Sequence, residues 1–259
     1  MAVRILPLGS SSSGNSTLLE FGRTRLLVDA GLSSRELTRR VEAAGVAPAS
    51  LSCILLTHEH HDHSRGTERF SMRHKVPVVC APEALEAMNL SPVHLASWDP
   101  ISPGHPFEID GVRVDPFPIP HDAVAPLGFV LEGEGVRVGI ALDLGHATTL
   151  VVERLRGCHV LFVESNHDDL MLQAGPYPWQ LKQRIGGRMG HLSNADAAAL
   201  LARVADDECR AVVLAHLSER NNTPALARST ASSALASAGR RRYEMRVAEA
   251  RRPSVPLTL

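Results

Sequence analysis

Short apolar runs separated by turns rich in glycine and serine dominate the start of the chain. Residues 2–8 form one such run, and residues 17–21 and 24–28 form two more on either side of Gly22-Arg23. Runs of this length, bounded by turn residues, are typical of β-strands, and the pair around Gly22 predicts a hairpin. The segment 9–15 is rich in serine and glycine, and it predicts a loop between the first two strands.

Beyond residue 30 the apolar runs alternate with segments that carry helix start and stop signals. Serine, threonine or proline opens these segments, and glycine follows several of them. The pattern predicts helices over residues 33–44, 82–88, 148–155, 193–204 and 223–239. It predicts further strands over residues 53–57, 76–80, 107–114, 129–142, 159–163, 210–215 and 243–248. The remaining long connections, residues 58–66, 91–106 and 166–190, are predicted to be irregular.

Strands that first pair as hairpins and later alternate with helices predict an α/β (α+β) fold, with two mixed β-sheets flanked by helices. No internal repeat, low-complexity segment or linker divides the chain, so we expect one domain over residues 1–259. With 44% hydrophobic residues, a chain of this length can bury a sizeable core without disulfides.

Composition narrows the class of protein. Lys and Arg number 27 against 28 Asp and Glu, so a bulk basic field for gripping nucleic acid is absent. No apolar run approaches the roughly 20 residues of a membrane span, and the first residues lack the pattern of a signal peptide. The four cysteines stand far apart without a Cys-x-x-Cys pair, which favours a reducing cytoplasm over disulfides or cysteine-bound zinc: Cys53, Cys80, Cys158 and Cys209.

A dense cluster of histidines and acids follows the strand predicted to end at Thr57. Four histidines and two acids fall within residues 58–63. Imidazole nitrogens and carboxylate oxygens are ligands of Zn²⁺ and similar metals, so a metal site is favoured over a solvated polar loop. His58 and His60 can point to one side of an extended turn, and Asp62 and His63 can face a second point. One loop could then serve two metals roughly 3.5–4 Å apart, as in two-metal hydrolases.

Further ligands are expected at strand ends elsewhere in the chain. His121, Asp143 and His216 each follow an apolar run, so all three could meet at one edge of the sheets. Any one of them alone is more typical of a satisfied polar residue. Together with the loop 58–63, they complete the number of ligands that two metals require.

The pattern His-x-His-x-Asp-His, followed by histidine, aspartate and histidine at strand ends, resembles the metallo-β-lactamase-fold hydrolases. The resemblance implies an αββα sandwich with two divalent metal ions. It implies that the first metal is held by His58, His60 and His121, that the second is held by Asp62, His63 and His216, and that Asp143 bridges them. Asp29 matches the acid that supports the metal loop in the family. The donor set does not select among Zn²⁺, Mn²⁺ and Fe.

Several further motifs are similar to those of the YycJ/WalJ/VicX-like subfamily, and the match extends from residue 3 to about residue 226. The motifs lie at residues 9–16, 121–123, 143–145, 164–168, 190–194 and 215–222. The resemblance implies a 5′-to-3′ exonuclease that acts on double-stranded DNA, with manganese supporting activity. The pattern of residues alone indicates a dimetal hydrolase and does not indicate DNA.

The second half of the chain is also similar to the transfer-RNA-processing enzyme tRNase Z, in which an acid and a histidine that is not a metal ligand assist the leaving group. The matching residues here are Glu164 and His191, and we assign catalytic roles to His191, Glu164 and Asp62. His191 could instead be a polar residue before a helix, and Glu164 could instead pair with an arginine. His167 is a lesser candidate for the proton donor.

These observations predict a dimetal phosphodiesterase that acts on nucleic acid through a metal-bound hydroxide. Backbone phosphates could be contacted by Lys182, Arg184 and Arg188, and by the six arginines of residues 240–252, while Tyr177 and Trp179 could stack on bases. Two alternatives stay open. One is a small-molecule hydrolase of the same fold, acting on a cyclic phosphodiester, thioester or lactone. The other is a metal-binding protein without catalysis. We expect no inserted domain between Asp143 and His216.

Overall fold

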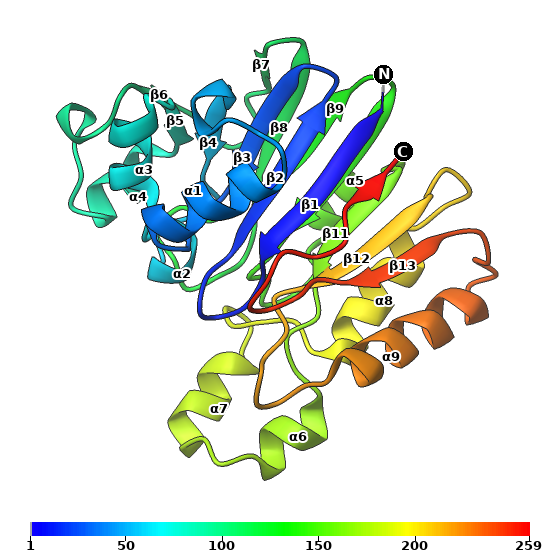
Figure 1. The fold of residues 1–259 in the computed structure, drawn as a ribbon. Helices are drawn as coiled ribbons and strands as arrows, with labels where there is room; N and C mark the ends of the chain where they lie inside the picture. Colours follow the sequence, from blue (N-terminus) through cyan, green and yellow to red (C-terminus); the bar gives the residue numbers. More distant parts are fainter. Residues whose placement is uncertain (1) are drawn as a thin grey trace.

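Two seven-stranded sheets pack face to face in the computed structural model, which describes residues 2–259 (Figure 1). The first sheet has the order β14 (Leu257–Thr258), β1 (Val3–Gly9), β2 (Ser16–Phe21), β3 (Thr24–Val28), β4 (Cys53–Leu55), β5 (Val78–Cys80) and β6 (Trp98–Pro100). Its strands are antiparallel from β14 to β3 and parallel from β3 to β6. The sheet is therefore mixed, as the sequence predicts.

The second sheet has the same mixed character. Its order is β13 (Glu244–Val247), β12 (Ala211–Ala215), β11 (Val160–Glu164), β10 (Val136–Ala141), β9 (Leu127–Gly133), β8 (Val112–Pro118) and β7 (Phe107–Ile109). Strands β7 to β10 are antiparallel, and β10 to β13 are parallel. The hairpin turns Asp110-Gly111 and Glu134-Gly135 have positive φ at both residues, the backbone of two-residue turns that match strand twist.

Three apolar layers hold the sandwich together. Between the sheets lie fully buried side chains such as Leu19, Phe129 and Phe162. The outer face of the first sheet is covered by α1 (Ser34–Ala43), α3 (Thr67–His74) and α4 (Pro82–Ala87). The outer face of the second sheet is covered by α5 (Thr149–Leu155), α8 (Asn194–Val204) and α9 (Pro224–Ser237). The expected αββα arrangement is confirmed.

The structure corrects the prediction that three segments are irregular. The segment after His60 forms α2 (His61–Ser64) and α3, and residues 166–190 contain α6 (Asp169–Ala174) and α7 (Trp179–Ile185). Residues 91–106 contain the edge strand β6 and a 3₁₀ helix (Pro92–His94), and a second 3₁₀ helix covers Pro48–Ser50. Helix α6 buries only Leu172 and α7 buries no residue, so neither has the apolar periodicity that marks a helix in a sequence.

Strands β3, β10 and β12 are each followed by a residue with a left-handed backbone. Asp29, Asp143 and His216 directly follow or closely follow these strands, and their φ angles are 61°, 51° and 53°. A left-handed backbone is uncommon for residues other than glycine, and it clusters at functional sites.

No helix among the described residues is long and apolar enough to cross a membrane.

Candidate metal centre

The histidine-rich loop between β4 and α3 provides four of the predicted ligands. His60 precedes the single turn of α2, where its carbonyl accepts the backbone N–H groups of His63 and Ser64 at 2.8 and 3.0 Å. This turn buries His63 completely and leaves His61 exposed. The loop thus turns four side chains inward, and His61 points away as the sequence predicts.

Three histidines form the first cluster. The ring centroids of His58, His60 and His121 lie 4.7 to 5.1 Å apart, and His121 Nε2 is 3.2 Å from His60 Nδ1. Each of the three histidines offers one ring nitrogen, and these three nitrogens lie within 4.8 Å of one another. This spacing would suit a shared metal ion. His58 Nε2 is buried and has no hydrogen-bond partner, so a polar atom is left without a partner in this cluster.

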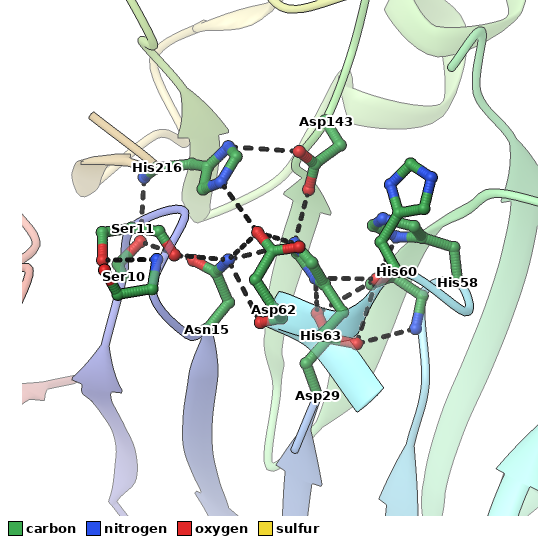
Figure 2. Close-up of polar contacts among 12 residues, drawn as sticks. Ser10, Ser11, Asn15, Asp29, His58, His60, Asp62, His63, Asp143 and His216 are labelled. Atoms are coloured by element: carbon green, nitrogen blue, oxygen red, sulfur yellow. Dashed lines mark hydrogen bonds and ion pairs between the residues drawn. The ribbon is translucent and has the colours of Figure 1, made fainter. Parts of the chain in front are cut away.

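The second cluster lies beside the first and joins both halves of the chain (Figure 2). Asp62 Oδ2 is 3.6 Å from His63 Nε2 and 3.5 Å from His216 Nε2. His216 Nε2 is buried and, like His58 Nε2, lacks a hydrogen-bond partner. Asp62, His63 and His216 would therefore offer two imidazole nitrogens and a carboxylate oxygen to one ion.

Asp143 lies between the two clusters (Figure 2). Its Oδ2 is 2.8 Å from His63 Nε2, and its Oδ1 is 4.0 Å from His121 Nε2. Asp143 is only 2% exposed, so its carboxylate is held among buried side chains. One carboxylate thus reaches both groups of histidines, which is the position expected of a bridging ligand.

The protonation of the histidines follows from the charges around them. Burial, reinforced by the neighbouring His63, lowers the pKa of His58 far below its usual value, and burial also lowers the pKa of His121. Burial opposes the charged form of His216 as well, but the carboxylates of Asp143, Asp62 and Glu164 raise its pKa to about 10. His58 and His121 therefore favour the neutral imidazole, the form that binds metal, whereas the carboxylates around His216 favour positive charge in the second cluster.

The two unpartnered nitrogens, His58 Nε2 and His216 Nε2, and the surrounding donor set fit divalent metal ions. A buried polar atom without a partner is costly, and a bound cation in each cluster would satisfy it. Imidazole and carboxylate donors suit Zn²⁺, Mn²⁺ or Fe.

Asp29 orients the histidine-rich loop through two hydrogen bonds. Its Oδ1 accepts the backbone N–H of Thr57 at 2.8 Å, and its Oδ2 accepts the Nδ1–H of His63 at 2.8 Å. This second bond turns His63 Nε2 toward the cluster, as supporting carboxylates do for metal-binding histidines. The structure therefore places Asp29 where the family resemblance implies.

Asn15 and Ser10 support ligands of the second cluster, a role that the sequence did not indicate for them. The amide of Asn15 lies 3.3 Å from Asp62 Oδ2, and the hydroxyl of Ser10 accepts the backbone N–H of His216 at 2.8 Å. Gly31 packs against the same loop so closely that an added Cβ would lie 1.6 Å from the carbonyl oxygen of Asp62. The only signal for Asn15 and Ser10 is their position in the serine- and glycine-rich segment 9–16.

Glu164 joins the clusters to His191. It is fully buried, and its Oε1 accepts the Nδ1–H groups of both His191 and His216 at 2.8 Å. Its Oε2 accepts the backbone N–H groups of Leu144 and Leu192. Burial opposes ionisation, but the two histidines lower the pKa of Glu164 to about 2. Its partners are histidines and backbone amides, so the alternative of an arginine partner is wrong.

His191 borders a cavity of about 280 Å³ beside the clusters. Its Nδ1 is held by Glu164, and its ring centroid lies 5.2 Å from that of His121 and 5.3 Å from that of His216. Its side chain is 21% exposed, whereas Glu164 beneath it is completely buried. The other ring nitrogen, Nε2, is thereby left for a molecule in the cavity. His167 does not line the cavity.

The basic residues proposed to contact phosphates are placed unequally. Arg184 lines the cavity, where its Nε bonds to Asp122 Oδ2 at 2.5 Å, but Lys182 bonds to the carbonyl of Gln173 and Arg188 lies against His146. Four of the six arginines in residues 240–252 form ion pairs: Arg240 with Asp207, Arg246 with Glu244, Arg251 with Glu219 and Arg252 with Glu249. Four of the six arginines predicted to contact phosphates are therefore paired with acids.

Comparison with known families matches residues 24–217 to the Beta-lactamase superfamily domain. The chain is 33% identical over 245 residues to Exodeoxyribonuclease YycJ of Bacillus anthracis, covering 92% of this chain and 91% of that protein. It is 34% identical over 237 residues to Exodeoxyribonuclease WalJ of Streptococcus pneumoniae, covering 89% and 87%. Among solved structures, the metallo-beta-lactamase fold protein YhfI from Bacillus subtilis matches with a TM-score of 0.77 and 14% identity, covering 100% of both chains.

Replacing Asp143 by alanine tests whether this carboxylate belongs to two metal sites. We expect Asp143→Ala to lose at least one equivalent of metal, because the variant lacks the only carboxylate that faces both histidine clusters among the described residues. Elemental analysis after gel filtration measures the metal content directly. Two tightly held ions in the variant would show that Asp143 is not a bridge.

Proposed function

The chain belongs to the β-lactamase superfamily and is a metal-dependent hydrolase, and on that premise we propose that it is a dimetal-dependent 5′-to-3′ exonuclease that acts on DNA. The observation that carries the proposal is the Glu164–His191 pair at the edge of the two metal-binding clusters. Two relatives that span about nine-tenths of the chain are named exodeoxyribonucleases. We place this reaction in a single domain in the cytoplasm, which the four isolated, buried cysteines favour.

We assign the ligands in two sets. One ion would be held by His58, His60 and His121, the other by Asp62, His63 and His216, with Asp143 shared. When bound, two such ions neutralise charge on a phosphate and lower the pKa of a water toward neutrality. We propose Zn²⁺ or Mn²⁺ as the natural occupants, with Fe as a third choice. Asp62 is partly exposed and lines the cavity, and we assign it a second role in orienting the attacking water.

His191 is the proposed proton donor to the leaving oxygen. Glu164 accepts its Nδ1–H, which fixes the ring so that Nε2 serves the cavity. Burial disfavours the imidazolium, but the carboxylate of Glu164 raises the pKa of His191. A protonated His191 would therefore be available beside a bound phosphate, and the adjacent anion favours that form further.

Contacts to the DNA backbone are expected to be few and local. Arg184 is the basic residue that lines the cavity, and its side chain is 63% exposed. The net charge of −1 supplies no long-range attraction for a polyanion. The protein would therefore recognise its substrate at the catalytic cavity rather than over a broad basic surface.

A small-molecule phosphodiesterase is the second candidate, and two observations favour it. The cavity has a volume of only about 280 Å³, and most arginines near the carboxyl terminus are paired with acids. A cyclic phosphodiester would fit such a cavity without further cationic surface.

One panel of substrates separates the two functions. Metal-reconstituted protein is incubated with 5′- or 3′-labelled duplex DNA, single-stranded DNA, RNA and bis-nitrophenyl phosphate. We expect Mn²⁺-dependent release of label from the 5′ end of DNA, with a rate that falls as salt rises because each phosphate contact releases counterions. Hydrolysis of the small phosphodiester without digestion of any polynucleotide would contradict the nuclease and support the alternative.

Replacing His191 by alanine tests its role as proton donor. We expect His191→Ala to retain both metals and its fold but to lose about 10²–10⁴ in turnover of DNA, the usual contribution of a positioned acid. The loss should shrink for a nitrophenyl ester, because nitrophenolate leaves without a proton. His61→Ala is the matched control, since His61 lies in the metal loop but is exposed. Loss of a metal from His191→Ala would make His191 a ligand, and unchanged turnover would move the role to His167.

A further inference from the structure

The catalytic cavity is lined by apolar side chains as well as by the histidines and carboxylates of the two clusters. Tyr177, Leu181 and Ile185 line the cavity from α7 and the residues just before it. We infer that this wall binds the base and sugar of the terminal nucleotide, the one that departs as the leaving group. The inference rests on the proposed nuclease function and specifies how that function selects its substrate.

The geometry of α7 supports a binding role rather than a structural one. Leu181 and Ile185 are four residues apart and therefore share one face of the helix, and Tyr177 immediately precedes its N-cap, Pro178. All three side chains are half-buried, and α7 has no fully buried residue. Figure 1 shows α6 and α7 standing off the sandwich. The apolar face of α7 therefore faces the cavity instead of the protein core.

The apolar wall is attached directly to the proposed proton donor. The backbone N–H of His191 donates to the carbonyl of Ile185 at 2.8 Å. An added Cβ at Gly190 would lie 2.2 Å from the carbonyl oxygens of Arg184 and Ile185, so only glycine permits this approach. The wall thus lies on the same side of the cavity as His191. A group that receives the proton from His191 would therefore lie close to this apolar wall.

The reaction identifies that group. In removal of a 5′-terminal nucleotide, the oxygen of water bonds to phosphorus and the bond from phosphorus to O3′ breaks. O3′ departs with the proton from His191, and the proton of the attacking water is released to solvent. The leaving group is then the terminal nucleoside, with its own 5′ end. Aromatic and aliphatic side chains match a base and a deoxyribose, and they offer nothing to a bare phosphate.

The size of the cavity limits what can enter. About 280 Å³ is at the lower end of the roughly 300–1,000 Å³ of pockets that hold small ligands, so the space suits one nucleotide and not a base pair. On this inference the terminal nucleotide enters the cavity unpaired from its partner strand.

Labelled duplexes that differ only in their terminal residue test the inference. One has a normal 5′-terminal nucleotide, the second has an abasic tetrahydrofuran residue at that position, and the third has the abasic residue at the third position. We expect kcat/KM for the first cleavage to fall about 5- to 100-fold with the terminal abasic residue, the usual contribution of one stacked base. The internal abasic residue should have little effect, and an unpaired normal end should be cleaved faster than a paired one.

A variant of Tyr177 locates the effect on this wall. Tyr177→Ala should lower kcat/KM about 5- to 100-fold on the normal end, should lose nothing further on the abasic end, and should keep the metal content of the wild type. Tyr177→Phe should restore activity, because the ring and not the hydroxyl makes the contact. Leu170→Ala is the control, since Leu170 lies in the neighbouring helix α6, is 75% exposed and lies outside the cavity.

The outcomes separate this inference from the proposed function. If DNA is digested but a terminal abasic residue is removed as fast as a normal one, the nucleoside wall is wrong and the nuclease stands. An equal loss for Tyr177→Ala on both ends would also overturn the wall. If Tyr177→Ala does not fold, the comparison of the substrates with wild-type protein still decides. If no polynucleotide is digested, the proposed function itself fails.

Discussion

Mutual burial of histidines and carboxylates at one end of the two sheets is the constraint on which the rest of this structure depends. His58, His63, His121, Asp143, Glu164 and His216 are each at most 2% exposed and lie against one another. Protons alone satisfy them poorly, because burial lowers the pKa of His58 and His121 while carboxylates raise the pKa of His63 and His216. Divalent cations would satisfy both groups at once, since they suit neutral imidazoles and compensate buried carboxylates.

The two packed sheets position these buried polar side chains. The proposed ligands lie in loops after β4, which belongs to the first sheet, and after β8, β10 and β12, which belong to the second. Each cluster therefore forms only when the two sheets are packed together. Asp29, Asp143 and His216 adopt a left-handed backbone that costs about 1–3 kcal/mol each. The apolar layers on both sides of each sheet offset that cost. Glu164 accepts hydrogen bonds from both His191, the proposed proton donor, and His216, a proposed metal ligand. The position of His191 therefore depends on that of His216.

Much of the fold and of the candidate ligand set could be predicted from the sequence. The hairpins and capped helices have local signals, and the density of histidine and acid in residues 58–63 has few structural explanations. The wall formed by α7 could not be predicted, because a helix with no buried residue lacks apolar periodicity. In residues 240–252 the sequence shows only the local acids Glu244 and Glu249 against six arginines, because the further partners Asp207 and Glu219 are distant in sequence. The sequence placed Asn15 in the serine- and glycine-rich segment 9–16 but did not indicate its contact with Asp62, because that contact joins residues 47 positions apart.

The central claim is that two metal ions share this site through Asp143. The most direct measurement is anomalous diffraction at the manganese edge from crystals grown with Mn²⁺. The account predicts two peaks, one within bonding distance of His58, His60 and His121 and the other within bonding distance of Asp62, His63 and His216, with the Asp143 carboxylate touching both. A single peak, or two peaks with Asp143 bound to neither, would contradict it.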